Sequence, residues 1–237
     1  MRIVLVAALA LAGCRGAAPA ASPRWMIARR DGGALQRGFG VQIVEARGER
    51  GRTADGRWFP LAALEPAQPL VGSAAAPGPR SIAPPTGVGA RDRWIDVDVA
   101  AQRLTAYEGA RAVRTVKVSS GVGEDGAPYS TPRGTFRIYA KLRAATMASE
   151  APPPGAPPEP HPYRFEAVPD VQYFNREVAL HGAYWHRRFG ERVSHGCVNL
   201  APADAAWLFE FTEPHLADGE RERATTPDRP GTIVRVR

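Results

Sequence analysis

The sequence has 237 residues, of which 44% are apolar, so it is long enough for one medium domain and a smaller one. Its net charge of +7 comes almost wholly from arginine, since Lys117 and Lys141 are the only lysines. No basic run is interleaved with aromatic residues, which argues against nucleic-acid binding. The charge fits either a solvated basic surface or attraction to an anionic polymer or membrane surface.

The N-terminus is typical of an export signal. A basic start at Met1-Arg2 is followed by an apolar run over Ile3–Leu11, which is too short to span a bilayer. The following L-A-G-C, ending at Cys14, resembles a bacterial lipobox. This resemblance implies cleavage after residues 1–13 and lipidation of Cys14, which would anchor the chain durably through several acyl chains. An ordinary cleaved signal is the alternative.

The next stretches suggest a tethered small module. Residues 14–24 are predicted to form a tether, and residues 25–66 a small, SH3-like β unit with strands at 41–44 and 57–61. Residues 67–90 are rich in Pro, Ala and Gly and predict a semi-rigid linker. The β unit carries no evident chemistry. A packing or spacing module and a ligand-binding module with exposed aromatic residues are both open.

Residues 91–237 predict a mainly β domain with one or two helices. Strict alternation over 94–99 predicts a half-buried strand with Ile95, Val97 and Val99 facing inward. Further strands are expected at 103–107, 113–119, 134–139, 178–180 and 232–236. The run after Leu200 predicts a helix with Pro202 in its first turn, ending before Pro214, with Ala205, Leu208, Phe209 and Thr212 on one face. The proline-rich stretch 141–163 predicts irregular structure that could act as a lid.

Cys197 and His181 are the candidate catalytic pair, sixteen positions apart. If Cys14 carries lipid, Cys197 is the single thiol of the mature chain, either as a reactive group or as a buried inert one. A thiol needs a base to become a good nucleophile, and a histidine at the end of a strand could supply it. The carbonyl of Gly182 could orient His181, and Gly196 would let backbone N–H groups converge on an oxyanion.

A zinc site is the rival use of these residues. His181, His186, His195 and Cys197 could be ligands, but no short Cys-x-x-Cys or His-x-x-x-His pair is present. We therefore expect no metal and no cofactor, and we place His186 on a loop that lines the cleft.

H-G-A-Y-W-H from His181 and S-H-G-C-V-N-L from Ser194 together resemble the signature of YkuD-type L,D-transpeptidases. The resemblance extends from about Arg91 to Arg237 and includes W-I-D-V-D and T-P-R-G-T-F-R-I-Y. It implies an L,D-transpeptidase-like β-sandwich whose cysteine attacks a peptide bond of peptidoglycan. In that family the thiolate attacks the carbonyl of the third residue of a tetrapeptide stem, D-alanine leaves, and an amine of a second stem resolves the thioester into a 3-3 cross-link.

Carried over by position, Cys197 is the nucleophile, His181 the general base and acid, and Gly182 the residue that orients His181. The residues expected to hold the oxyanion or the substrate are Ser194, His195, Gly196, Asn199, Tyr184, Trp185 and His186.

The expected partners are peptidoglycan stem peptides, a membrane through the N-terminal lipid, and no nucleic acid, for a monomeric protein facing the periplasm. Arg15, rather than an aspartate, follows Cys14 and favours the outer membrane of a diderm cell. Water as acceptor would give an L,D-carboxypeptidase or peptidase, and a protein amine an anchoring enzyme. A wall-binding lipoprotein without catalysis is the alternative of another class.

Overall fold

The structure is a computed structural model that describes residues 23–31, 36–67, 72–73, 82–149 and 163–237. The predicted signal, Cys14 and half of the predicted linker lie outside these residues. The fold is mainly β with a single helix in the described part of the chain, as the sequence predicts.

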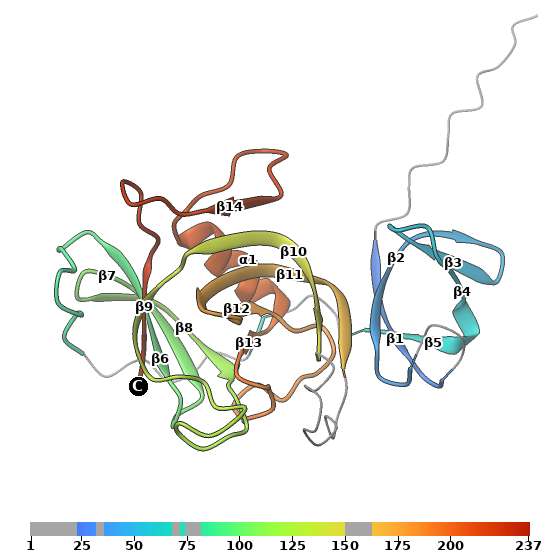
Figure 1. Ribbon diagram of the computed structural model, residues 1–237, viewed down its shortest axis with the longest axis horizontal. Coiled ribbons are helices and arrows are strands. Elements are labelled where there is room, and N and C mark those ends of the chain that lie inside the picture. Colours follow the sequence, from blue (N-terminus) through green and yellow to red (C-terminus); the bar gives the residue numbers. More distant parts are fainter. Residues whose placement is uncertain (1–22, 32–35, 68–71, 74–81, 150–162) are drawn as a thin grey trace, which may run out of the picture.

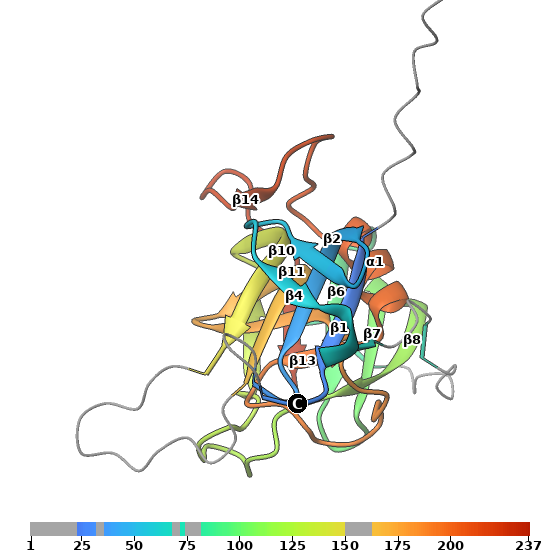
Figure 2. The same ribbon diagram turned by 90° about the vertical axis from the view of Figure 1, so that its right-hand side faces the viewer.

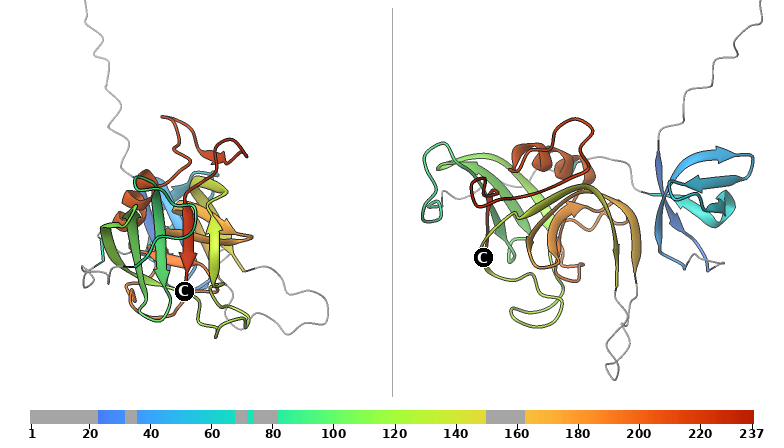
Figure 3. Two further views of the ribbon diagram at one scale, coloured as in Figure 1. Left: turned by 90° about the vertical axis from the view of Figure 1, so that its left-hand side faces the viewer. Right: turned by 45° about the horizontal axis from the view of Figure 1, so that its top comes forward.

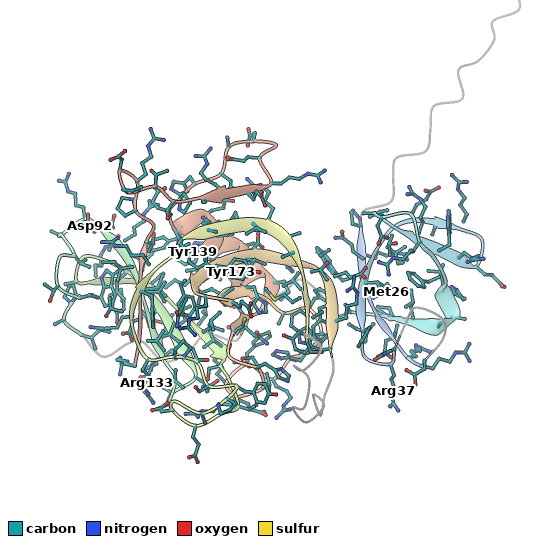
Figure 4. The ribbon with its side chains drawn as sticks, viewed as in Figure 1. Met26, Arg37, Asp92, Arg133, Tyr139 and Tyr173 are labelled. Atoms are coloured by element: carbon teal, nitrogen blue, oxygen red, sulfur yellow. The ribbon has the colours of Figure 1, made fainter. Side chains whose placement is uncertain are left out.

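The N-terminal unit is a small, strongly bent sheet at the right of Figure 1. β1 pairs with β2 and β5, and β3 lies between β2 and β4. The apolar side chains of alternate positions form its own small core, in which Met26 lies (Figure 4). The strands are β1 (Arg24–Ala28), β2 (Gly40–Arg47), β3 (Arg50–Thr53), β4 (Trp58–Pro60) and β5 (Leu64–Pro66), with a 3-10 turn at Leu61–Ala63 before β5.

The larger part of the molecule is a strongly curved sheet. Its strand order runs β11-β12-β13-β8-β7-β6-β15-β9, and β10 pairs with β11 and β14. Figure 3 shows β6, β7, β8 and β15 together on the side away from the N-terminal unit. The strands are β6 (Arg93–Asp98), β7 (Arg103–Glu108), β8 (Arg111–Ser119), β9 (Gly134–Arg137), β10 (Ala140–Ala148), β11 (Arg164–Asn175), β12 (Val178–Gly182), β13 (Val198–Leu200), β14 (Glu222–Ala224) and β15 (Ile233–Val236).

Helix α1 (Pro202–Phe211) covers β11 and β12 and closes the main core. Its predicted inward face is confirmed, since Ala205, Leu208 and Phe209 are buried with the following Thr212. Lys141 of β10 is buried beneath the end of the helix, where its ammonium group donates to the carbonyls of Phe209 and Thr212. These are carbonyls that a helix end leaves without partners.

Two predictions about strands were wrong. β6 is buried on both faces rather than one, because Asp96 is also buried, where Arg235 and Arg237 form ion pairs with it. The stretch 141–163 is not irregular throughout, because Lys141 to Ala148 belong to β10, which pairs with β11. The prolines that prompted the prediction lie in 150–162, outside the described residues.

β11 was missed because its pattern is broken. It contains Pro169, and Ala167 and Asp170 have φ of 50° and 58°. These residues interrupt the alternation that marks a strand in sequence. β11 is nevertheless central, because it also joins the N-terminal unit by a parallel bridge between Phe165 and Gly40 of β2. Figure 2 views the molecule from the side of the N-terminal unit, which lies in front of the larger sheet.

Candidate active site

Two neighbouring strands bring the candidate pair together. β12 ends in His181-Gly182 and runs parallel to β13, with Leu180 opposite Val198 and His181 opposite Asn199. Side chains alternate along a strand, so Cys197, two residues before Asn199, faces the same side as His181 on the diagonal. Both side chains line one cavity of about 490 Å³.

His181 is arranged as a neutral base. Its Nδ1 lies 3.2 Å from the carbonyl oxygen of Gly182, so Nδ1–H donates there and Nε2 is left to accept a proton. Its ring lies over Trp185, with 5.7 Å between the ring centroids. Burial lowers the pKa of His181 to about 4, because desolvation penalises the imidazolium form. At neutral pH this imidazole is therefore uncharged.

Cys197 is arranged as a protonated thiol in the free protein. Burial raises the pKa of the thiol to about 11, and a hydrogen bond from the backbone of Ala179 only partly opposes this. The charge of Glu177 raises the pKa further, and the thiol itself lies 3.8 Å from the Glu177 backbone oxygen. The attack on a carbonyl therefore needs transfer of the thiol proton to a base during the step.

The turn before Cys197 is closed by Ser194. Its hydroxyl donates to the carbonyl of Cys197 at 2.5 Å and accepts the N–H of Gly196 at 3.1 Å. Gly196 has φ of +127°, a conformation that side chains rarely allow. Because the Gly196 N–H is engaged by Ser194, an oxyanion would have to compete with that hydroxyl for the Gly196 donor.

Thr131 is a supporting residue that the sequence motif does not reveal. Its side chain is buried, its hydroxyl donates to the carbonyl of Gly196 at 2.8 Å, and it accepts the N–H of Gly121 at 2.9 Å. The glycine-rich loop between β8 and β9 thereby holds the turn that carries Cys197. The run T-P-R-G hinted at this position, but no local pattern indicates a contact 65 residues away.

His186 and Asn199 form a second pair in the cavity wall. The backbone N–H of Arg188 donates to Nδ1 of His186 at 3.1 Å, and Nε2 lies 3.0 Å from the side-chain nitrogen Nδ2 of Asn199. A neutral imidazole has one acceptor nitrogen, and Oδ1 of Asn199 has no hydrogen-bond partner within the described part of the chain. If the side-chain amide of Asn199 is flipped, Oδ1 takes the place of Nδ2 and accepts the Nε2–H of His186. Oδ1 then has a partner, and Nδ1 is the single acceptor nitrogen of the neutral imidazole. Burial lowers the pKa of His186 to about 4, which keeps it neutral.

The remaining predicted residues separate into two groups. Trp185 and His195 line the cavity, and the indole of Trp185 stacks on Phe165 with centroids 3.8 Å apart. His195 contacts the ring of Tyr129 edge-on at a centroid distance of 4.9 Å. Tyr184 does not line the cavity, because its ring is fully buried and its hydroxyl donates to the Glu166 carbonyl at 2.7 Å. The structure therefore places Tyr184 in the packing rather than against substrate.

The cavity wall also contains residues that lie outside the sequence motif. Arg37, Gly38 and Phe39, just before β2, reach it from the N-terminal unit, while Glu177 reaches it from the turn after β11. Nothing in the local sequence of residues 36–40 signals this position, because it depends on how the unit docks on β11.

Comparison with known proteins supports one family. Residues 92–236 match the YkuD family, described as the L,D-transpeptidase catalytic domain. The chain belongs to the L,D-transpeptidase family. Bacillus subtilis YciB is 30% identical over 127 residues, which cover 52% of this chain and 62% of that protein. L,D-transpeptidase 1 of Mycobacterium tuberculosis is 31% identical over 115 residues, covering 47% of this chain and 43% of that protein.

A solved L,D-transpeptidase from Mycobacterium smegmatis aligns with a TM-score of 0.48 at 26% identity, covering 62% of this chain and 58% of that one. The match thus spans less than two thirds of each of these relatives. In the described ranges, no helix is long and apolar enough to cross a membrane.

Proposed function

We propose that this protein is an exported, cysteine-dependent L,D-transpeptidase that forms 3-3 cross-links in peptidoglycan. The observation that carries the proposal is the placement of His181 in β12 and of Cys197 directly before the parallel strand β13, with both side chains lining the same cavity. Membership of the family supports the reaction class.

In the acylation step, the sulfur of Cys197 attacks the carbonyl carbon of the third stem residue while its proton passes to Nε2 of His181. The Gly182 carbonyl, which accepts from Nδ1–H, stabilises the imidazolium that forms. We assign the developing oxyanion to the backbone N–H of Cys197, with the Gly196 N–H as a second donor once it leaves the Ser194 hydroxyl. His181 then gives the proton to the leaving nitrogen, D-alanine departs, and a thioester remains on Cys197.

In the second step, an amine of another stem attacks the thioester carbonyl and His181 takes the proton from the attacking nitrogen. The amide forms, the carbon–sulfur bond breaks and Cys197 recovers its proton from the imidazolium. The same site would hydrolyse the thioester if water attacked instead, which would make the protein a carboxypeptidase.

The test is incubation of the purified protein with a disaccharide-tetrapeptide, followed by mass spectrometry of the products. The proposal predicts release of D-alanine and a dimer linked through the third residues, both lost in Cys197→Ala. Release of D-alanine without dimer would contradict cross-linking and indicate a carboxypeptidase. No reaction in the intact chain would favour a non-catalytic wall-binding lipoprotein.

We also propose that the chain acts in the cell envelope as a periplasm-facing lipoprotein held by lipid on Cys14, with the outer membrane favoured. The support is the sequence alone: the apolar run 3–11, L-A-G-C at the cleavage position and Arg15 after it. Metabolic labelling with a fatty-acid analogue should mark the wild-type protein and leave Cys14→Ala unlabelled. Labelling that persists in Cys14→Ala, or none in the wild type, would contradict lipidation.

A further inference from the structure

We propose that the N-terminal β unit forms part of the substrate-binding site, and that Arg37 binds a carboxylate of the acyl-donor stem peptide. This inference rests on the proposed function for the identity of the ligand. It assigns a role to a unit that lies outside residues 92–236, the part that matches the family.

The first support is that specific contacts hold the N-terminal unit against the catalytic part of the chain, residues 92–236. The indole of Trp25 donates to the carbonyl of Ala167 at 2.9 Å, across 142 residues of sequence. The Arg57 guanidinium donates to both carboxylate oxygens of Glu166, at 2.8 and 2.6 Å. The Glu166 side chain is only 11% exposed, so this pair is partly shielded from water. A unit attached in this way holds its neighbouring loop in place against the cavity.

The second support is the close packing between the unit and Tyr184, which lies behind the cavity wall. A side chain at Gly40 would place its Cβ 2.4 Å from the hydroxyl oxygen of Tyr184, so only glycine allows this approach. Tyr184 contacts Trp185 edge-on at a centroid distance of 5.1 Å, and Trp185 lies over His181. The segment Arg37–Phe39 leads directly into Gly40. Its position in the cavity wall therefore follows from this packing.

The third support is the charge that Arg37 brings. The cavity is also lined by Arg188, but that side chain forms an ion pair with Glu191 at 2.7 Å. Among the described residues, no carboxylate pairs with the Arg37 guanidinium, and its side chain is exposed at the lower end of the unit in Figure 4. The backbone N–H of Arg37 donates to Oδ1 of Asp31 at 2.8 Å, so this bond does not engage the guanidinium.

A tetrapeptide stem that ends in D-alanine carries a free carboxylate next to the bond that is cleaved. A guanidinium can bind a carboxylate through two parallel hydrogen bonds, which gives both charge complementarity and direction. Arg37 thus suits recognition of an acidic peptide, whereas the apolar Phe39 and Trp185 suit its aliphatic parts.

The experiment measures binding without turnover. In the full chain carrying Cys197→Ala, the dissociation constant is measured by calorimetry for the free-acid tetrapeptide and for forms in which one carboxylate at a time is amidated. Arg37→Gln is compared with Arg50→Gln, a matched control in β3 of the same unit that does not line the cavity.

We expect Arg37→Gln to weaken binding of the free acid about fivefold to tenfold. The parent, which carries Cys197→Ala alone, should bind one amidated form weakly, and adding Arg37→Gln should not lower the affinity for that form further. Adding Arg50→Gln should leave the affinity for every peptide equal to that of the parent. Equal affinity of parent and Arg37→Gln, or equal loss for every peptide, would overturn the inference. Absence of binding to the parent would overturn it too. Release of D-alanine from the tetrapeptide by the native chain is measured separately. If D-alanine is released, the proposed function stands even when the inference about Arg37 fails.

Discussion

The thiol of Cys197 should titrate far above neutral pH. With a pKa of about 11, roughly one molecule in ten thousand carries the thiolate at pH 7. A chain with Cys14→Ala leaves Cys197 as the only cysteine, so iodoacetamide alkylation followed by intact mass reports its ionisation directly. The alkylation rate should rise about tenfold per pH unit through neutrality and level off only near pH 11.

The variant His181→Asn distinguishes most sharply between a neutral Cys197 thiol and a thiolate–imidazolium pair. Because the pKa of His181 is about 4, the imidazole is neutral above pH 5 and places no positive charge beside the thiol. The substitution should therefore leave the alkylation profile nearly unchanged while abolishing turnover. A Glu177→Gln control should lower the thiol pKa, since the Glu177 charge raises it. An alkylation plateau already at pH 5–7 that is lost in His181→Asn would refute this reasoning and indicate a thiolate–imidazolium pair.

Three further outcomes test the supporting structure. Burial lowers the pKa of Lys141 from 10.5 to about 8, so the folded chain holds this proton less firmly than the unfolded chain. Relative to Lys141→Met, the wild type should gain up to about 3 kcal/mol in urea unfolding as pH rises from 8 to 10.5; a pH-independent difference would contradict this. Gly40→Ala should lower stability by about 1–3 kcal/mol in the same assay, because its Cβ meets the buried ring of Tyr184; an unchanged midpoint would contradict the close packing. Thr131→Val should reduce kcat/KM by about tenfold through loss of the bond to Gly196, and Thr131→Ser should restore it; failure of serine to restore activity would contradict that role.

Local patterns predicted much of the catalytic part of the fold. The apolar face of α1 and the inward residues of β6 follow from periodicity, and the structure buries both. The proximity of Cys197 to β12 could be anticipated because the two halves of the motif lie close in sequence. Burial of Asp96 could not, because it depends on two arginines near the other end of the chain.

The walls of the site were less predictable than its centre. Thr131 and Arg37 reach the cavity region through contacts between distant segments, and β11 is masked in sequence by Pro169 and two residues with positive φ. Tyr184 is the reverse case, because it was expected to contact substrate and the structure buries it away from the cavity. It adjoins Trp185 in the motif, yet successive residues point to different sides, so one lines the cavity and the other packs against the N-terminal unit.

The most direct test of the central claim is intact mass of the protein after exposure to a carbapenem, a class known to acylate this family. Attack by the Cys197 sulfur on the lactam carbonyl opens the ring without loss of atoms, so the protein mass should rise by the mass of one drug molecule. The adduct should be absent in Cys197→Ala and retained in Cys14→Ala. An unmodified wild type, or an adduct that persists in Cys197→Ala, would contradict the assignment of Cys197 as the nucleophile.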